Sequence, residues 1–322
     1  MKLISVMIPC YNEEANIEEM YLRITKIFQD LPQYNYELII PDNCSTDNTP
    51  NILRSLASKD AHVKVLLNAR NFGVERSCTN AFLQCSGDAV IQIASDFQDP
   101  PEMILEFIHY WEQGFKIVLG QKCSTKDSWI IGTCRKIYYR MMNYLADNGH
   151  INNVTGFGLY DKDVMDILRW MEDPLPYTRG IICDLGIEIK LIPYNKLQRQ
   201  KGKSSYNFKS YLDTAIWAIT NTSKKPLRCI LGLSIILLLL SILIIIFACA
   251  AGYVYQNNLW IILPVIFAMT SLIIFSIGIV GEYVGLIVTK ITKRPLTVTK
   301  EKINFNDEDS HTIITDKKMY GQ

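Results

Sequence analysis

VIQIASDFQDPPE, residues Val90–Glu102, is the stretch that decides the fold, because a buried-looking strand runs directly into an acidic turn and two prolines. The β-branched run Val90–Ile93 favours a strand, and Pro100 and Pro101 are typical of the first turn of a helix. In an open α/β sheet, ligands bind beyond the carboxyl ends of the strands. The stretch therefore predicts an α/β fold and the edge of the sheet that carries its site.

The two aspartates of this stretch have different expected roles. Asp96, with the amide of Gln98 nearby, suits a divalent cation that carries a nucleotide diphosphate, because hard cations prefer oxygen ligands. Asp99 stands three residues before Glu102, which is the spacing of a helix N-cap and its capping box. The pattern predicts Asp96 as a ligand and Asp99 as a helix cap.

Strand-like runs and helical patterns alternate through the first 120 residues. Such alternation predicts a mainly parallel sheet with covering helices. The first helix is the clearest, because its apolar residues recur at spacings of three and four. That stripe, expected in the core, consists of Ile17, Met20, Tyr21, Ile24, Ile27, Phe28 and Leu31. The strands are expected at Leu3–Ile8, Glu37–Ile40, Val63–Leu67, Ala89–Ile93 and Lys116–Leu119.

Polar clusters follow the first four of these strands. They are Pro9–Glu14, Pro41–Asp47, Asn68–Gly73 and the turn at Asp96. Ordinary turn and cap chemistry explains any one of them equally well. Because the carboxyl ends of parallel strands meet at one edge of a sheet, the four loops are expected to converge there.

The region after residue 120 has a looser pattern, which is expected to complete the site and to select the acceptor. The expected elements are a helix across Ile130–Ala146, a loop at Asn152–Gly158, a helix near Lys162–Met171 and a strand at Ile187–Pro193. Asn207–Thr222 is aromatic and amphipathic, which fits a helix on a membrane surface or, alternatively, an ordinary packed helix. The polar tail after Pro295 is expected to be flexible.

Two long apolar runs lie near the C-terminus. Cys229–Gly252 and Leu259–Gly281 contain no charged residue, and each reaches the roughly 20 residues that cross a bilayer. Basic residues flank the pair on both sides, which by the positive-inside rule predicts cytoplasmic soluble parts. Gly278, Gly281 and Gly285 would permit close helix packing, so this pair is also a candidate surface for a homo-oligomer.

These patterns divide the chain into four expected parts and predict a protein of the cell (inner) membrane. The parts are a cytoplasmic α/β domain over 1–206, an amphipathic interfacial region over 207–228, two transmembrane helices within 229–289 (about 229–252 and 259–288) and a cytoplasmic tail over 290–322.

Composition and missing motifs argue against several classes of protein. Nine cysteines show neither CxxC spacing nor a His/Cys cluster, which disfavours a zinc site or a disulfide framework. A net charge of +1 gives no field that would attract nucleic acid. Neither a GxGxxG after the first strand nor a P-loop occurs, so dehydrogenase and ATPase interpretations lose support.

Motifs along most of the chain, up to about residue 298, carry a resemblance to a known family. They are Ile8–Glu14, Asp42–Thr49, Arg70–Gly73, Asp96–Glu102, Arg179–Gly180, Gly202–Tyr206, Lys225–Arg228, Gly281–Gly285 and Lys293–Pro295. In this order they resemble the family 2 inverting glycosyltransferases of GT-A fold. More narrowly, they resemble the membrane-anchored polyisoprenyl-phosphate glycosyltransferases, a group that includes dolichol-phosphate mannose synthase and the bactoprenol glucosyltransferases.

The resemblance implies inverting transfer of a single sugar to a polyprenyl phosphate of the undecaprenyl type, for a cell envelope glycan. The donor would be a nucleotide-sugar, expected to be a UDP-hexose, used at the cytoplasmic membrane face. A lipid phosphate is already an anion at neutral pH, so it needs cationic positioning more than a general base.

The resemblance also implies roles for individual residues. The catalytic residues would be Asp96 and Gln98, and Asp96 would hold Mg²⁺ or Mn²⁺. The nucleotide-sugar would be bound by Pro9, Tyr11, Glu13, Asp42, Asn71 and Ser95. The lipid phosphate would be bound by Arg135, Arg140, Arg199, Lys203 and Ser204.

Several positions depart from the family pattern. Ala94 and Asn43 stand where relatives commonly carry aspartate, Thr155–Leu159 lacks the acid and arginine often seen there, and Gln121–Cys123 lacks the usual arginine. With fewer carboxylates, a bound metal is expected to depend more on the phosphates of the substrate. Two alternatives stay open at this point. One is the same donor with another lipid or a glycan as acceptor, and the other is a catalytically weak scaffold that binds a nucleotide-sugar.

Overall fold

The computed structural model describes residues 1–124, 140–145, 151–173, 177–197, 208–250, 259–292 and 294–305. The chain divides into two units. The first comprises Met1–Cys134, Ile151–Tyr206 and Lys293–Gln322, and the second comprises Arg135–His150 and Asn207–Thr292.

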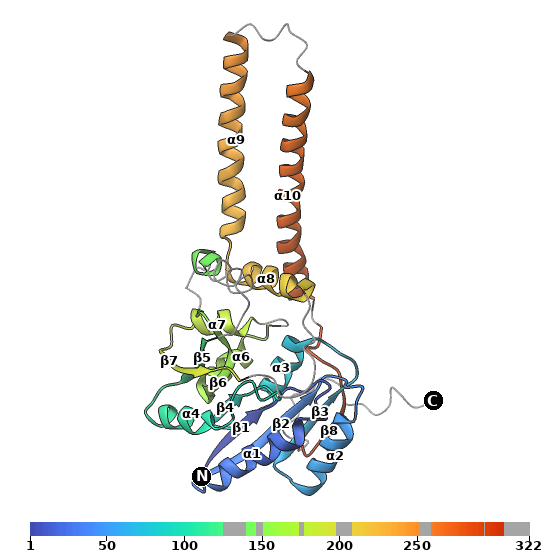
Figure 1. The fold of residues 1–322 in the computed structure, drawn as a ribbon, viewed down its shortest axis with the longest axis vertical. Coiled ribbons are helices and arrows are strands. Elements are labelled where there is room, and N and C mark those ends of the chain that lie inside the picture. Colours follow the sequence, from blue (N-terminus) through green and yellow to red (C-terminus); the bar gives the residue numbers. More distant parts are fainter. Residues whose placement is uncertain are drawn as a thin grey trace, which may run out of the picture. The chain divides into compact units, whose positions relative to one another are not determined.

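The described part of the first unit contains an eight-stranded sheet (Figure 1). Its strands are β1 (Lys2–Met7), β2 (Tyr34–Asp42), β3 (Val63–Asn68), β4 (Ala89–Gln92), β5 (Ile117–Ser124), β6 (Val154–Asp161), β7 (Ile189–Asn195) and β8 (Thr299–Ile303). The strand order is β7-β5-β6-β4-β1-β2-β3-β8. The pairs β1–β2, β1–β4, β2–β3 and β5–β7 are parallel, and the other three are antiparallel. The mainly parallel sheet and the five strands expected in the first 120 residues are confirmed.

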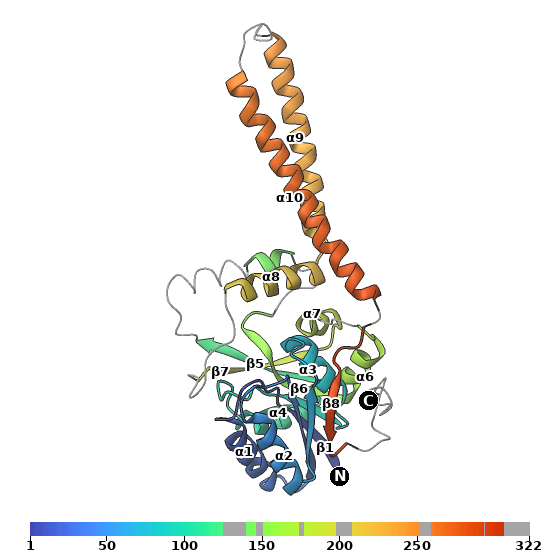
Figure 2. The same ribbon diagram turned by 90° about the vertical axis from the view of Figure 1, so that its right-hand side faces the viewer.

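Helices cover both faces of this sheet (Figures 1 and 2). One apolar cluster joins the sheet to α1 (Ile17–Gln29), α2 (Thr49–Lys59) and α4 (Met103–Glu112). A second cluster joins the opposite face to α3 (Val74–Leu83), α6 (Lys162–Trp170) and α7 (Thr178–Asp184). The strands are apolar on both faces because each face is covered by helices.

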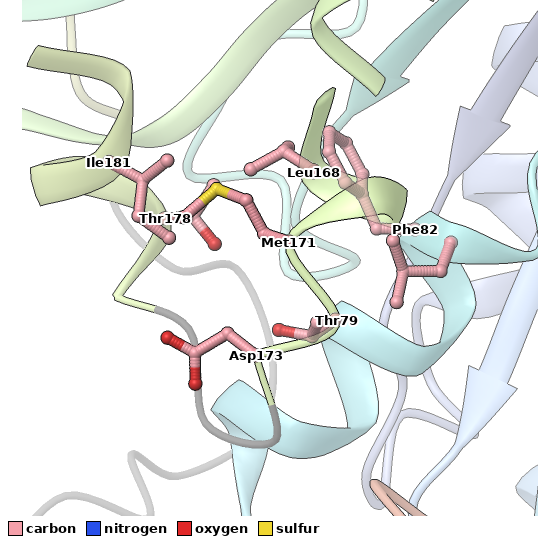
Figure 3. A pocket seen from close by; sticks show the side chains of 8 residues that line it. Thr79, Phe82, Leu168, Met171, Asp173, Thr178 and Ile181 are labelled. Atoms are coloured by element: carbon pink, nitrogen blue, oxygen red, sulfur yellow. The ribbon is translucent and has the colours of Figure 1, made fainter. Parts of the chain in front are cut away.

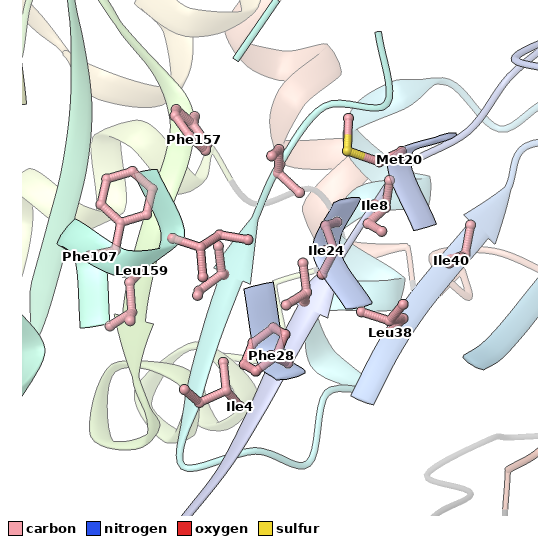
Figure 4. Packing of buried hydrophobic residues seen from close by; sticks show 14 of the residues in the cluster. Ile4, Ile8, Met20, Ile24, Phe28, Leu38, Ile40, Phe107, Phe157 and Leu159 are labelled. Atoms are coloured by element: carbon pink, nitrogen blue, oxygen red, sulfur yellow. The ribbon is translucent and has the colours of Figure 1, made fainter. Parts of the chain in front are cut away.

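The alternation of side chains along a strand explains how one sequence fills two cores. Leu38 and Ile40 of β2 belong to the first cluster, whereas Ile39 between them belongs to the second. In the first cluster, Ile8, Met20 and Ile24 lie near Leu38 and Ile40 (Figure 4). The expected stripe of α1 is confirmed as core, because Ile17, Met20, Ile24 and Phe28 are all buried.

The loop expected at Asn152–Gly158 is wrong, because most of it forms β6. Gly156 has a φ of +92°, and a Cβ at Gly158 would lie 2.3 Å from the carbonyl oxygen of Val118 on β5. Gly156 is therefore needed for its backbone conformation and Gly158 for the close approach of β5, but in the sequence both look like loop residues.

The flexible tail expected after Pro295 is also wrong over Thr299–Ile303, because these residues form β8. β8 pairs antiparallel with β3, and Arg54 of α2 forms a 2.8 Å ion pair with Glu301. The side chain of Asn304 donates to the carbonyl oxygens of Ala57 and Val63 at 2.8 and 2.9 Å. This strand is polar because it lies at the edge of the sheet, where charged residues are common.

The second unit is helical in its described part. Its helices include α8 (Phe208–Thr222), α9 (Lys225–Ala250) and α10 (Leu259–Ile291). Among the described residues, one helical segment, Met269–Ile291, is long and apolar enough to cross a membrane, with a mean hydropathy of 2.1. The hydroxyl of Tyr283 on α10 donates to the carbonyl oxygen of Ser223 at 2.5 Å. The helix expected at Ile130–Ala146 lies mostly outside the described residues, of which 140–145 are helical.

Candidate functional site

The order of the strands places a topological switch point at the carboxyl end of β1. β1 lies between β2 and β4. The chain continues from β1 to β2 and β3 on one side, and then crosses to β4 on the other side of β1. In α/β folds, ligands bind at the carboxyl end of the strand where the order reverses in this way. Two hydrogen bonds join the chain at the carboxyl ends of β1 and β4. The amide of Ile93 donates to the carbonyl oxygen of Met7 at 3.1 Å, and the hydroxyl of Ser95 donates to that of Pro9 at 3.0 Å. Ser95 is therefore a tie between two of the loops.

The loops after β1 and β2 are also bound together. The backbone N–H of Asn12 donates to the Ser45 hydroxyl at 2.8 Å. The backbone N–H of Thr46 donates to the side-chain oxygen of Asn12, also at 2.8 Å. The amide of Glu13 donates to the Thr49 hydroxyl at 2.9 Å. These bonds connect the first two polar loops that the sequence predicts to converge.

Asp42, at the end of β2, is 2% exposed. Its carboxylate accepts hydrogen bonds from the amide and the hydroxyl of Ser45. Burial raises the pKa of Asp42, and these hydrogen bonds oppose that rise. Glu13 is buried as well, and its carboxylate accepts a 2.6 Å hydrogen bond from the Asn16 side chain. Tyr11 differs from these two acids because its ring is exposed.

A chain of amides connects the ends of β2 and β3. The Asn43 side chain donates to that of Asn71 at 3.0 Å, and its oxygen accepts a 3.0 Å hydrogen bond from the amide of Phe72 and one from Asn68 at 3.3 Å. An amide meets both demands at this position, because it donates and accepts, whereas an ionised aspartate only accepts. The departure at Asn43 therefore has a structural reason.

Each of the four loops turns through one residue with a positive φ. These are Asn12 at 56°, Cys44 at 66°, Gly73 at 85° and Phe97 at 59°. Glycine adopts this conformation readily, whereas a bulky residue such as phenylalanine rarely does. Non-glycine residues in this region are often found at functional sites, where the surrounding structure maintains the strain.

Phe97 anchors the turn that carries the predicted catalytic residues. Its ring is buried, with the guanidinium carbon of Arg23 4.8 Å from the ring centroid. On either side, Asp96 and Gln98 are partly exposed, and the amide of Gln98 donates to the Asp96 carboxylate at 3.2 Å. The buried ring thus leaves one carboxylate and one amide partly exposed at the carboxyl edge of the sheet.

Asp99 is not the helix cap that its spacing predicts. The residue before the first turn of α4 is Glu102, and no side chain caps this helix end. Asp99 is 5% exposed instead, accepts a hydrogen bond from the hydroxyl of Tyr194 and lies 4.0 Å from the Lys122 ammonium group. Burial raises the pKa of Asp99, and Lys122 and Tyr194 limit the rise. The sequence contains no local signal for this cluster, because its members come from three separate segments.

The segment that follows β7 contacts the same turn. The amide of Leu197 donates to the carbonyl oxygen of Gln98 at 3.0 Å. Four of the residues expected to bind a lipid phosphate lie outside the described residues, namely Arg135, Arg199, Lys203 and Ser204. The fifth, Arg140, is exposed on the helical stretch 140–145 of the second unit.

The donor set at this edge of the sheet suits a metal ion that is shared with a substrate. In the described part of the chain, no three His, Cys, Asp or Glu side chains gather into a metal-binding group. Mg²⁺ needs only one or two protein carboxylates when phosphate oxygens and water complete its shell. Asp96, which is partly exposed, fits as a single protein ligand of this kind.

A separate small pocket lies between α3, α6 and α7 (Figure 3). It is lined by Thr79, Phe82, Leu83, Leu168, Met171, Asp173, Thr178 and Ile181. None of the predicted site residues lines this mainly apolar pocket, so the carboxyl edge of β1, β2 and β4 is the better candidate for chemistry.

The family model for glycosyl transferase family 2 matches residues 5–168, which include all four loops. The chain is 30% identical over 306 residues to "Putative glycosyltransferase CsbB" of Bacillus subtilis (strain 168), across 93% of this chain and 92% of that protein. It is 28% identical over 303 residues to the SfII prophage-derived bactoprenol glucosyl transferase of Shigella flexneri, across 92% and 97% of the two chains.

A solved structure shares the fold. The crystal structure of glucosyl-3-phosphoglycerate synthase from Mycobacterium tuberculosis, in complex with Mn²⁺, uridine diphosphate and phosphoglyceric acid, is similar with a TM-score of 0.50. It is 20% identical, and the match covers 68% of this chain and 76% of that chain, so the likeness concerns the fold alone. Given the mainly parallel sheet, the polar loops at its carboxyl edge and these matches, the chain belongs to glycosyl transferase family 2 and has its GT-A fold.

Proposed function

We propose that this protein transfers one sugar from a nucleotide-sugar, a UDP-hexose, to a polyprenyl phosphate of the undecaprenyl type, with inversion and at the cytoplasmic membrane face. The observation that carries the proposal is the partly exposed pair Asp96 and Gln98 beyond the carboxyl ends of β1 and β4, where the polar loops meet. The similarity to a bactoprenol glucosyl transferase along 92% of the chain supports the choice of acceptor.

The donor would lie across the loops after β1, β2 and β4. The exposed ring of Tyr11 offers a surface for the base, and the loop residues Pro9, Glu13 and Asp42 would surround the base and ribose. Asn71 and Ser95 would shape the site, since each already makes a hydrogen bond that joins two loops. Hydrogen bonds between the loops hold these groups in position before a substrate binds, which lowers the entropy cost of binding.

Asp96 would hold Mg²⁺ or Mn²⁺ together with the diphosphate of the donor. A bound metal ion acts as a Lewis acid that stabilises the charge on the departing nucleoside diphosphate. Gln98 would orient the same diphosphate or the sugar through its amide.

The acceptor would attack through a phosphate oxygen. The new bond joins this oxygen to the anomeric carbon, while the bond from that carbon to the diphosphate breaks and the electron pair leaves with the nucleotide. A phosphate anion is already deprotonated at neutral pH, so no general base is required. The segment with Arg199, Lys203 and Ser204 follows Leu197, whose amide donates to Gln98, which supports an acceptor site beside the catalytic turn.

The topology of the sheet supports two membrane crossings, by α9 and α10. β3 precedes both helices in the sequence, whereas β8 follows both, and the two strands pair in one sheet. Strands of one sheet lie on one side of a membrane, so the chain between them would cross an even number of times. Several large apolar side chains of α9 and α10 are exposed, which favours contact with lipid.

The test is a transfer assay with the purified full-length protein in detergent. Undecaprenyl phosphate and a panel of radiolabelled UDP- and GDP-sugars are supplied with Mg²⁺ or Mn²⁺, and the organic phase is analysed for labelled lipid. We expect one donor to give a lipid-linked sugar. Asp96→Asn is expected to lower kcat by at least about 100-fold, because it removes the carboxylate at the diphosphate.

Asp30→Asn is the matched control, because Asp30 is an exposed residue at the C-terminal end of α1. It should leave transfer unchanged. Failure to form a lipid-linked product with every donor would sink the proposal, and equal transfer to diacylglycerol would favour the other acceptor class. A donor that binds without any turnover would instead favour the scaffold.

A further inference from the structure

Three arginines of the first unit gather near the carboxyl end of β3. Arg70 follows β3 by two residues, Arg76 lies in the first turn of α3, and Arg294 belongs to the segment that leads into β8. The guanidinium carbons of Arg70 and Arg76 lie 4.1 and 5.7 Å from the centroid of the Phe72 ring. Arg76 donates to the carbonyl oxygen of Pro295 at 2.5 Å, which holds the segment with Arg294 beside α3.

The positive charge of this arginine cluster (Arg70, Arg76 and Arg294) is not neutralised by the chain. Among the residues that the structure describes, no carboxylate oxygen lies within ion-pair distance of the three guanidinium groups. Other arginines of the first unit differ in this respect, since Arg54 pairs with Glu301 at 2.8 Å, and Arg169 with Asp166 at 2.6 Å. Three like charges without a counter-charge are unfavourable unless an anion binds among them.

Arg76 carries the clearest sign of an unmet interaction. Its Nε atom is buried and has no hydrogen-bond partner. Burial lowers the pKa of Arg76, and the charges of Arg70 and Arg294 lower it further. Arg70 and Arg294 are themselves exposed, so the cluster is open to an incoming ligand. Guanidinium groups form paired hydrogen bonds with phosphate oxygens, which makes phosphate the fitting anion.

The cluster begins beside Asn71, whose carbonyl oxygen accepts a 3.2 Å hydrogen bond from Arg70, but it lies away from Asp96. In the strand order, β1 and β2 lie between β4, which leads to Asp96, and β3, which leads to Arg70. Three strand spacings amount to about 14 Å. A diphosphate held by Asp96 would therefore not be held by this cluster at the same time.

The source of the phosphate is indicated by the position of Arg294 in the sequence. Only Thr292 and Lys293 separate it from Ile291, the last residue of the segment that is long and apolar enough to cross a membrane. Basic residues next to a membrane span attract anionic lipid headgroups. We propose that Arg70, Arg76 and Arg294 form a binding site for the phosphate of an anionic phospholipid. This site goes beyond sugar transfer and does not depend on the identity of donor or acceptor.

Binding can be measured without any activity assay. The purified full-length protein in a non-ionic detergent is titrated calorimetrically with dihexanoyl-phosphatidylglycerol, and separately with inorganic phosphate and with UDP. We expect the triple variant Arg70→Gln, Arg76→Gln and Arg294→Gln to bind the lipid at least about tenfold more weakly. UDP binding should be equal in both proteins, which separates this result from any failure of the proposed transferase function.

A charge-matched control removes three exposed lysines elsewhere, by Lys26→Gln, Lys59→Gln and Lys162→Gln. It should bind the lipid as the unaltered protein does. Arg70→Gln alone, which removes an exposed side chain, tests the site should the triple variant not fold, and at least about threefold weaker lipid binding is expected. Unchanged lipid binding in the arginine variants would overturn the proposal. The proposal would also be overturned if inorganic phosphate bound as tightly as the lipid, or if the arginine variants lost UDP binding together with lipid binding.

Discussion

At the scale of single residues, Asp99 shows how burial decides what an acidic group does. Its carboxylate is held by the Tyr194 hydroxyl from β7 and lies near Lys122 from β5. The pKa of Tyr194 is raised, mainly by burial and also by the nearby charge of Asp99. Its phenol therefore remains a hydrogen-bond donor at any physiological pH. The cluster ties the turn after β4 to β5 and β7.

Tyr194→Phe tests the cost of this buried carboxylate. Because the pKa of Asp99 is raised in the folded state, the folded state loses stability as the pH rises through that pKa. The Tyr194 hydroxyl limits the rise in the pKa, so its removal makes this loss of stability larger. We expect a loss of about 1–3 kcal/mol in the free energy of unfolding at pH 8, and a smaller loss near pH 4, because the raised pKa keeps a larger share of Asp99 protonated there. Chemical unfolding of the full chain, followed by tryptophan fluorescence at both pH values, measures it.

Tyr160→Phe is the matched control, because the Tyr160 hydroxyl donates to the uncharged carbonyl of Gly156 at 2.9 Å. Its cost should not change with pH. An equal loss at pH 8 and pH 4 for Tyr194→Phe would contradict the argument.

The turn that carries Asp96 and Gln98 could be predicted from the sequence because its signal is local: a polar stretch directly after an apolar strand. The role of Asp99 could not. Its partner Tyr194 is 95 residues away, and the sequence near Asp99 matches a helix cap equally well.

At the scale of elements, β1, β2 and β3 share one buried carboxylate, that of Glu37 on β2. It accepts hydrogen bonds from the Ser5 hydroxyl of β1 and, at 2.8 Å, from the amide of Ser86, and it forms a 2.8 Å ion pair with Lys64 of β3. Burial opposes ionisation of Glu37, but these contacts outweigh it and hold its pKa below the ordinary value. The network fixes the pairing of three adjacent strands.

Glu37→Gln is expected to destabilise the fold in a pH-dependent way. A lowered pKa means that the carboxylate stabilises the fold above its ordinary pKa, and that this stabilisation is lost as the pH falls through the folded-state pKa. We expect a loss of about 3 kcal/mol at pH 7, because the charge of Lys64 loses its buried partner, and a smaller loss below about pH 4. Urea unfolding at several pH values measures the difference.

Glu301→Gln provides the comparison, since its pair with Arg54 is partly exposed. Exposed ion pairs contribute less than about 1 kcal/mol, so this variant should stay close to the unaltered protein. A larger loss for Glu301→Gln than for Glu37→Gln would contradict the expected effect of burial.

At the scale of the whole molecule, the pairing of β3 with β8 links the chain before α9 to the chain after α10. The proposed topology follows from this link, and it can be tested in intact cells with a membrane-impermeant maleimide polymer. Asn257→Cys, between the two apolar runs, should gain one adduct from outside. Lys59→Cys, exposed on α2, should gain its adduct only after the cells are opened.

The two variants distinguish the possible arrangements. Labelling of Lys59→Cys from outside would reverse the orientation, and protection of Asn257→Cys in intact cells would exclude two crossings. The unaltered protein is labelled in the same experiment, and its adducts give the background from the native cysteines.

The α/β class, the strands of the first 120 residues, the polar loops at the carboxyl edge of the sheet and the apolar segments near the C-terminus all followed from the sequence alone. These features depend on periodicity and composition over short stretches, which any chain with the same pattern shares. The tertiary structure alone decided that β6 and β8 are strands, that Asp99 is a buried anchor and that three arginines meet beyond β3. Arg76 and Pro295, for example, are 219 residues apart. Contacts over such separations depend on how the whole chain packs, so no local pattern could encode them.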